Sequence, residues 1–286
     1  MAEYRIIARD TRDILGEGPL WSASQNALYW VDIKAKKVWR HSLADDAVKS
    51  WDMPELIGWL IERRDHPGFV AGFQTGIVAL TLDPLTVTPL CAPEPHRPGN
   101  RLNDAKVDGL GRLWFGTMDN REEADLGSLY RLDPDLTHSS HDDGYRVTNG
   151  PTFNLDGSVL YHTDSARRTV FRFDLRPDGG LENKTVFVTF EDSWGYPDGM
   201  TTDAEGSLWI AHWGGGRISR FSPEGGLERS IALPASQITS CAFAGTGLDR
   251  LFVTSASIGL SDEPEAGQLF EVEAGVRGLA PQAFAG

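Results

Sequence analysis

Several residue types are scarce in this 286-residue chain, and each shortage excludes a class of protein. Basic residues are outnumbered, with 27 Lys and Arg against 41 Asp and Glu and a formal net charge of −14. Nucleic-acid backbones and anionic lipid surfaces attract clustered positive charge, so we expect neither a nucleic acid nor a membrane as a partner. Long hydrophobic runs are also missing. The longest, residues 56–61, contains Gly58 and is too short to cross a bilayer.

Cysteine is equally scarce, with Cys91 and Cys241 as its two examples. Secreted domains held together by disulfides contain far more cysteine, so the sequence favours a reducing, cytoplasmic location. The first residues, Met1 to Arg5, are followed by charged residues rather than the apolar segment of a signal peptide, which agrees with that expectation.

Glycine and tryptophan are abundant, with 31 and 9 residues, and the aromatic residues mark a repeat. Six strand-like segments are centred on Trp30, Val70, Trp114, Tyr161, Trp209 and Phe252. The steps between these markers are 40, 44, 47, 48 and 43 residues, which is the spacing of propeller blades. A second segment with alternating apolar residues follows each marker, as in residues 169–175, and helical periodicity is absent.

This pattern predicts an all-β fold, a six-bladed β-propeller that occupies residues 1–286 as a single domain. The last blade lacks a strand, and we expect residues 4–8 to complete it and close the ring. Tight hairpins are predicted where Asp or Asn is followed three residues later by Gly, at 65–68, 108–111, 154–157 and 203–206. A β-sandwich is the alternative fold, which the regular period disfavours.

Polar residues recur at one position of the repeat. Counting back five residues from the start of the first hairpin turn in blades one, three, four and five gives Glu17, Asn103, Asn149 and Asp198. The same count gives Leu60 in blade two, and Ser240 lies nearby in blade six. Because the innermost strands line the channel of a propeller, the four polar side chains should lie at one height around the axis.

Oxygen-bearing side chains in a ring suggest a cation site. Glu17, Asn149 and Asp198 offer hard oxygen ligands that suit Ca²⁺, Mg²⁺ or Mn²⁺, and Zn²⁺ and Fe²⁺ stay open. The competing interpretation is that Asn149 and Asp198, each followed by Gly, belong to ordinary turns. Their shared position in the repeat favours one divalent metal ion.

The motifs around these residues resemble the SMP-30/gluconolactonase/regucalcin family of six-bladed propellers. The matching stretches are residues 15–21, 28–33, 101–108, 114–118, 148–151 and 196–199. The resemblance implies a metal-dependent lactonase, a carboxylic ester hydrolase that opens a sugar lactone such as glucono-, xylono- or arabinolactone to the sugar acid. It also implies metal ligands at Glu17, Asn149 and Asp198, and substrate contacts from Arg101, Asn103 and an acidic residue of the 119–126 loop, assigned to Glu122.

Opening a lactone needs a polarised carbonyl and a partly deprotonated water. The cation would act as Lewis acid, and three protein ligands would leave coordination positions open. We expect Asp198 to be the general base, with Arg101 and Asn103 orienting sugar hydroxyls. Two other functions compete: a non-enzymatic Ca²⁺-binding propeller, and a propeller esterase or organophosphate hydrolase. An arginine beside the cation favours an enzyme, because a calcium buffer does not need one.

Overall fold

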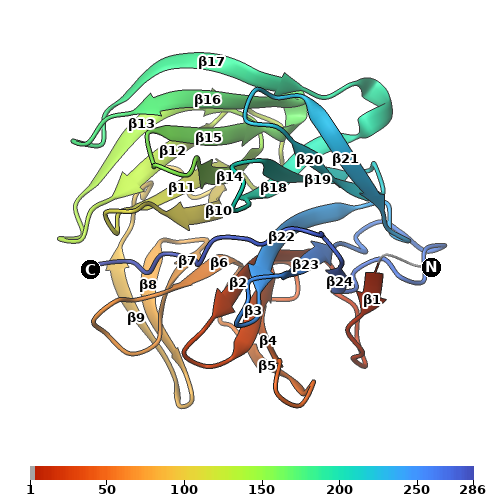
Figure 1. Ribbon diagram of the computed structural model, residues 1–286. Helices are drawn as coiled ribbons and strands as arrows, with labels where there is room; N and C mark the ends of the chain where they lie inside the picture. Colours follow the sequence, from red (N-terminus) through yellow and green to blue (C-terminus); the bar gives the residue numbers. More distant parts are fainter. Residues whose placement is uncertain (1–3) are drawn as a thin grey trace.

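The computed structural model describes residues 4–286, which form six four-stranded antiparallel sheets around a central axis (Figure 1). This architecture confirms the predicted six-bladed β-propeller. Residues 1–3, part of the N-terminal stretch considered for a signal peptide, lie outside the described residues. Within residues 4–286 the helices are the 3-10 turns η1 (Ser165–Arg167) and η2 (Asp192–Trp194). No helix of this part of the chain has the length and apolar composition to span a bilayer.

In the first three blades the strands run outward from the axis in chain order. Blade one contains β2 (Gly16–Ser22), β3 (Ala27–Asp32), β4 (Lys37–Ser42) and β5 (Val48–Asp52). Blade two contains β6 (Ile57–Glu62), β7 (Phe69–Phe73), β8 (Ile77–Leu82) and β9 (Leu85–Cys91). Blade three contains β10 (Asn100–Val107), β11 (Leu113–Asp119), β12 (Gly127–Leu132) and β13 (His138–Tyr145).

Blades four and five continue this arrangement, and blade six closes the ring. Blade four contains β14 (Thr148–Phe153), β15 (Val159–Asp164), β16 (Thr169–Leu175) and β17 (Leu181–Thr189). Blade five contains β18 (Tyr196–Thr202), β19 (Leu208–Trp213), β20 (Arg217–Phe221) and β21 (Leu227–Ala232). Blade six contains β22 (Ile238–Ala244), β23 (Arg250–Ser255), β24 (Phe270–Val272) and β1 (Tyr4–Ile6).

The N-terminal strand completes the last blade, as the sequence predicted. β1 pairs antiparallel with β24, with Tyr4 opposite Val272 and Ile6 opposite Phe270. The sixth sheet therefore joins the start of the chain to its end. This closure ties the two ends of the chain together and leaves β1, rather than β24, as the outer strand of the blade.

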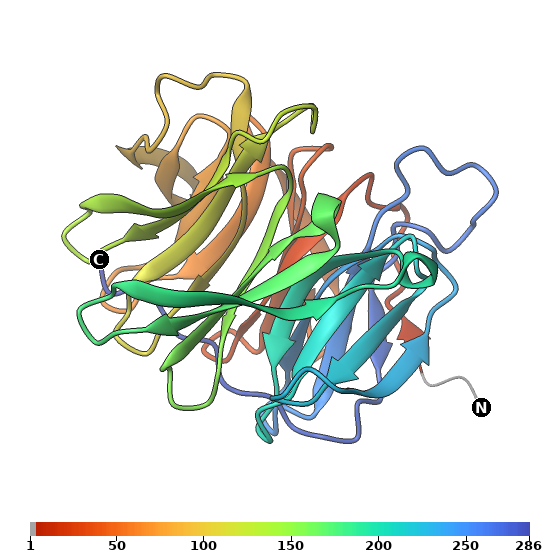
Figure 2. The same ribbon diagram turned by 90° about the horizontal axis from the view of Figure 1, so that it is seen from above.

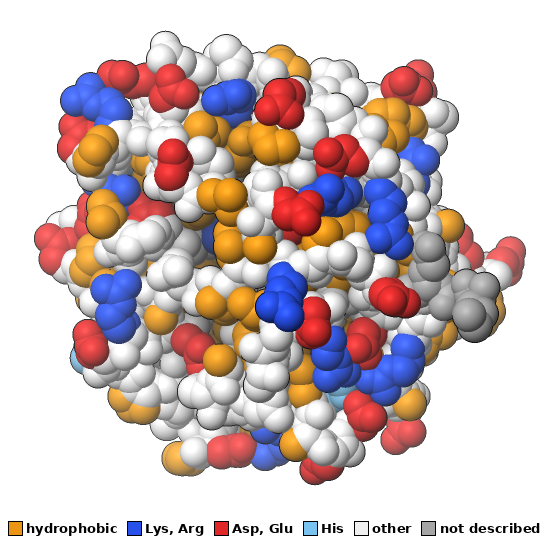
Figure 3. Space-filling view, viewed as in Figure 1, with side chains coloured by type: hydrophobic (Ala, Val, Ile, Leu, Met, Phe, Trp, Pro, Cys, Tyr) orange, Lys and Arg blue, Asp and Glu red, His pale blue; other side chains and the backbone are white. Residues whose placement is uncertain are grey.

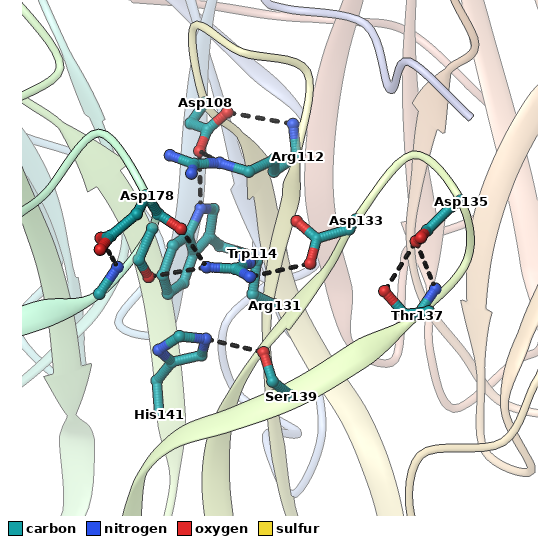
Figure 4. Close-up of polar contacts among 12 residues, drawn as sticks. Asp108, Arg112, Trp114, Arg131, Asp133, Asp135, Thr137, Ser139, His141 and Asp178 are labelled. Carbon is teal, nitrogen blue, oxygen red and sulfur yellow. Dashed lines mark hydrogen bonds and ion pairs between the residues drawn. The ribbon is translucent and has the colours of Figure 1, made fainter.

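The predicted turns at 108–111, 154–157 and 203–206 close with a backbone hydrogen bond, whereas residues 65–68 form a bend. Asp108 and Asp203 hold the marker tryptophans of their blades. Gly111 and Gly206 have φ angles of +83° and +89°, the left-handed region that glycine enters without a side-chain clash. The Asp108 carboxylate accepts a 2.9 Å hydrogen bond from Nε1 of Trp114 and also binds Arg112 (Figure 4). Trp114 is completely buried, so the marker tryptophans serve blade packing.

The C-terminal segment, residues 275–286, crosses the ring at the hairpin end of the innermost strands (Figures 1 and 2). Its backbone bonds blade six where Gly278 N–H donates to Leu248 O at 2.7 Å, and blade two where Phe284 N–H donates to Glu62 O at 2.9 Å. Phe284 is fully buried among core residues of blades two and three. Figure 3 shows this face, on which charged side chains of both signs are dispersed rather than gathered in one acidic patch.

Candidate functional site

Every innermost strand has a register irregularity near its start. The ladder is interrupted between Glu17 and Leu20, Ile57 and Trp59, Leu102 and Ala105, Asn149 and Thr152, Pro197 and Met200, and Ile238 and Ser240. A β-bulge bends its strand and redirects the side chains beside it. Six bulges at one level therefore give the propeller a ring of redirected side chains at one end of the channel.

All six residues assigned from the sequence line one cavity of about 460 Å³ at this end. Four of them project from innermost strands: Glu17 from β2, Asn103 from β10, Asn149 from β14 and Asp198 from β18. Arg101 also lies on β10, and Glu122 lies in the connection between β11 and β12. The structure brings these residues together, while their roles as ligands, base and substrate contacts stay predictions.

In blades two and six, the residues named by counting back from the hairpin turn do not line this cavity. Leu60 and Ser240 line a separate cavity at the opposite end of the channel. The count misses the bulge of blade two because Asp65 lies three residues beyond the end of β6, whereas the turns of blades three to five follow their strands directly. The bulge residue is Gly58, where a Cβ would lie 2.6 Å from the carbonyl oxygen of Leu102. Blade two therefore offers backbone that packs closely against blade three.

A chain of hydrogen bonds joins the polar residues of blades three, four and five. Arg101 donates to Oδ1 of Asn103, and Nδ2 of Asn103 donates to Oδ1 of Asn149 at 3.0 Å. Nδ2 of Asn149 donates to Oγ of Ser165 at 2.9 Å, and this hydroxyl donates to the carbonyl of Pro197 at 2.6 Å. The chain fixes the amide of Asn149 with its oxygen as the acceptor, which is the atom that a cation would need.

Two buried carboxylates face each other in this cavity. Burial, reinforced by the charge of Asp104, raises the pKa of Glu17 to about 8. Burial and the Glu17 carboxylate hold the pKa of Asp198 well above its usual range. Oδ1 of Asp198 is buried and has no hydrogen-bond partner. Paired carboxylates with an unsatisfied oxygen carry a large desolvation and repulsion cost, which a divalent cation would relieve.

The donor set fits a hard cation. Residues 4–286 contain no group of three or more His, Cys, Asp or Glu side chains placed to hold a metal. The two carboxylates therefore need a neutral oxygen as third ligand, and the oriented amide of Asn149 supplies one. Such all-oxygen sets suit Ca²⁺, Mg²⁺ or Mn²⁺ better than ions that prefer sulfur or nitrogen.

Arg101 and Glu122 are two charged residues that also line the cavity. The Arg101 side chain is buried and its Nε has no hydrogen-bond partner; burial lowers the pKa of its guanidinium, and the Glu122 charge opposes that shift. Glu122 has a φ of +62°, an uncommon backbone conformation for a residue other than glycine, asparagine or aspartate. The connection between β11 and β12 thus reaches the channel mouth.

Polar residues of this site that sequence reasoning missed include Lys34, Arg146 and Ser165. Lys34 lines the cavity from the turn between β3 and β4, the blade-one counterpart of the connection that carries Glu122. Searching the connection between the second and third strands of every blade for polar residues would have found it. Ser165 begins η1 after β15. No local pattern signals its bond to Asn149, because that bond depends on how the end of β15 meets the start of β14.

Two histidines and two tryptophans lie on the first or second strands of their blades. His162 and His212 are fully buried; His162 packs edge-on against Tyr145 at 4.7 Å, and neither lines the cavity. Trp213 does line it, together with Tyr196, whereas Trp59 lines the opposite cavity. Trp213 is thus the tryptophan placed to contact a ligand at this end.

Comparison with known proteins agrees with the fold. Residues 15–257 match the model of the SMP-30/gluconolactonase/LRE-like region. An L-arabinolactonase of Azospirillum brasilense is 37% identical over 285 residues, covering 97% of this chain and 94% of the relative. Regucalcin of Danio rerio is 36% identical over 282 residues, covering 95% of each protein.

Solved structures show the same relationship. A luciferin-regenerating enzyme superposes with a TM-score of 0.93 at 32% identity, covering 99% of each chain. A calcium-binding protein, regucalcin, from Agrobacterium tumefaciens superposes with a TM-score of 0.93 at 27% identity, covering 98% of this chain and 97% of the other.

Proposed function

Because the chain belongs to the SMP-30/gluconolactonase/LRE family, we propose that it is a metal-dependent hydrolase that opens sugar lactones to sugar acids. One observation carries this proposal: the facing carboxylates of Glu17 and Asp198 share a cavity with the oriented amide of Asn149 and the buried guanidinium of Arg101. The same cavity therefore contains two carboxylates that can bind a cation and hydrogen-bond donors that can bind an oxygen-rich substrate.

An aldonolactone such as glucono-, xylono- or arabinolactone is the proposed substrate class. The similarity to an L-arabinolactonase supports this choice, as does the polar lining of the cavity by Asn103, Glu122 and Lys34. These side chains can donate or accept hydrogen bonds, which suits a ring that carries several hydroxyl groups.

We propose that Glu17, Asn149 and Asp198 hold one divalent cation. When bound, such an ion supplies a Lewis acid for the ester carbonyl and lowers the pKa of water. The remaining work falls to the chain itself. Asp198, whose Oδ1 has no partner in the protein, accepts a proton from the attacking water. Arg101 donates hydrogen bonds to the hydroxyls of the sugar. Oδ1 of Asn103 accepts one, because both N–H groups of this amide are already bound to Thr148 and Asn149. Together the two residues hold the lactone carbonyl towards that water.

Hydrolysis of several aldonolactones, followed with a pH indicator, tests the proposal. We expect activity with Mn²⁺, Ca²⁺, Mg²⁺, Zn²⁺ or Fe²⁺, its loss on chelation and its return when the ion is added back. No hydrolysis of any lactone with any of these ions would refute it.

A non-enzymatic calcium-binding propeller is the second candidate, and the similarity to a solved calcium-binding regucalcin favours it. Calorimetric binding of Ca²⁺ without any lactone hydrolysis would support this alternative. Hydrolysis of aryl or phosphate esters in place of lactones would instead indicate the propeller esterase considered from the sequence.

A further inference from the structure

The residues that line the cavity include a buried arginine, Arg101, without an acidic partner in direct contact. Two other deeply buried arginines have one: Arg9 binds Asp13 at 2.8 Å and Arg112 binds Asp108 at 2.6 Å. Arg101, only 4% exposed, directs one nitrogen to neutral oxygens, the Leu102 carbonyl and the Asn103 amide. Within residues 4–286 no carboxylate lies within 4.0 Å of its guanidinium. Burying a guanidinium without a paired anion carries a large desolvation cost, which binding of an anion would offset.

Lys34 adds a second cation at the same place. It is half-buried, lines the same cavity, and donates to Oδ1 of Asn120 at 3.2 Å, a neutral acceptor. Burial lowers the pKa of Lys34, and so does the nearby charge of Arg101, whereas Glu122 opposes the shift. Lys34 and Arg101 are therefore close enough to feel each other's charge.

The acidic residues of the cavity do not balance these two cations. Glu17 and Asp198 face each other and are assigned to the metal ion. Glu122 is then the one acidic residue left for Arg101 and Lys34 among the residues lining this cavity. The other cation of the lining, Arg146, is already bound to Asp125 at 2.8 Å. One positive charge at the mouth thus has no counterpart once the cation ligands are set aside.

We propose that Arg101 and Lys34 bind a carboxylate of the substrate, so that the site prefers the lactone of a sugar diacid over a neutral aldonolactone. This inference rests on the proposed lactonase function. Arginine presents two parallel N–H groups to a carboxylate, and lysine adds a point charge. A neutral lactone offers hydroxyls at the same place and leaves both cations without an anion.

The test compares two lactones that differ at carbon 6. D-glucaro-1,4-lactone carries a carboxylate there, and D-glucono-1,4-lactone carries a hydroxymethyl group. We expect the wild-type protein to have the higher kcat/KM for the glucarolactone. In Lys34→Met the ratio of the two kcat/KM values should fall about tenfold, the effect of one hydrogen bond to a charged group. Lys34→Arg should retain most of the ratio.

Lys36→Met is the matched control. Lys36 is exposed in the same turn and does not line the cavity, so its removal changes the net charge equally. We expect both kcat/KM values to stay at the wild-type level in this variant. A wild-type preference for the neutral lactone, or an unchanged ratio in Lys34→Met, would overturn the inference.

A binding measurement separates this inference from the proposed function. Calorimetry with D-glucaro-1,4-lactone and D-glucono-1,4-lactone, in the presence of chelator, needs no catalysis. If no lactone is hydrolysed but the glucarolactone binds more tightly than the gluconolactone and Lys34→Met removes the difference, the lactonase proposal fails and the carboxylate site stands. If lactones are hydrolysed and the glucarolactone has no advantage in binding or in kcat/KM, the carboxylate site alone is wrong.

Discussion

The two ends of the central channel are built from the same strands but treat their polar groups in opposite ways. At the hairpin end, Asp203 accepts from Nε1 of Trp209 at 3.0 Å and pairs with Arg220 at 2.7 Å. At the bulged end of the same strand, five residues earlier, Asp198 keeps a buried oxygen without a partner. Identical side chains on β18 or directly after it are therefore satisfied at one end and unsatisfied at the other.

The two ends of the channel also differ in which chain segments cover them. The C-terminal segment crosses the hairpin end, where Leu279 to Gln282 help to line a cavity of about 370 Å³. The bulged end is bordered by strand connections that carry Lys34 and Glu122. A protein that satisfies its polar groups at one end and leaves them unsatisfied at the other is using the first for stability and the second for binding.

The largest expected contrast is between Asp198→Asn and Asp203→Asn. Asp198→Asn removes the proposed base, so we expect kcat/KM for a lactone to fall about a thousandfold. Asp203→Asn should lower the melting temperature, because Arg220 loses its buried anion, and leave kcat/KM within about twofold of wild type. Equilibrium dialysis with the metal ion accompanies both assays. Full activity of Asp198→Asn with the ion still bound would show that another group is the base.

Removing the anchor of the C-terminal segment should cost stability rather than activity. Phe284 is fully buried, so we expect Phe284→Ala to lower the free energy of unfolding by about 3–5 kcal/mol, measured by urea denaturation. Leu279→Ala is the control, because Leu279 is exposed on the same segment and its loss should change stability by less than about 0.5 kcal/mol. If Phe284→Ala folded normally but lost activity, the two ends of the channel would be coupled.

A pH dependence of stability is expected at the bulged end. The pKa of Glu17 is raised from 4.5 to about 8, so the folded metal-free protein holds a proton that the unfolded chain releases. This contribution is complete below about pH 4.5 and is lost as pH rises through about 8, at up to about 1.4 kcal/mol per pH unit. With chelator present, the wild-type melting temperature should therefore fall more steeply between about pH 5 and 9 than that of Glu17→Gln.

Comparing the two proteins separates the Glu17–Asp198 pair from titrating groups elsewhere in the protein; the two carboxylates are compared together because the charge of Glu17 also raises the pKa of Asp198. Burial lowers the pKa of His162 to about 3, which makes stability rise with pH below its unfolded value of 6.5 and partly masks the carboxylate. Both proteins share that histidine. Saturation with a divalent cation should flatten the wild-type profile, and parallel profiles without the cation would contradict the assignment of the raised pKa to Glu17.

The repeat made much of this protein predictable. Regular spacing of Trp30, Trp114 and Trp209 indicated the blades, and counting from the turns located Asn103 and Asp198 without a structure. The count worked where the turn follows the strand directly and failed in blade two, where Asp65 lies farther along the chain and Gly58 takes the place of Leu60. Periodicity predicts a position only as well as the loop lengths keep the register.

The sequence by itself determined the all-β repeat, the six blades, the closing N-terminal strand and the oxygen-bearing residues that recur at one position. These follow from local patterns, because alternation and turn residues act over a few positions. Tertiary structure alone decided that Ser165 orients Asn149 and that Lys34 lines the same cavity as Arg101. It also decided that Arg101 lacks the carboxylate partner that the buried Arg9 and Arg112 have. Each depends on how separate segments meet, which local patterns do not specify and only the closed ring fixes.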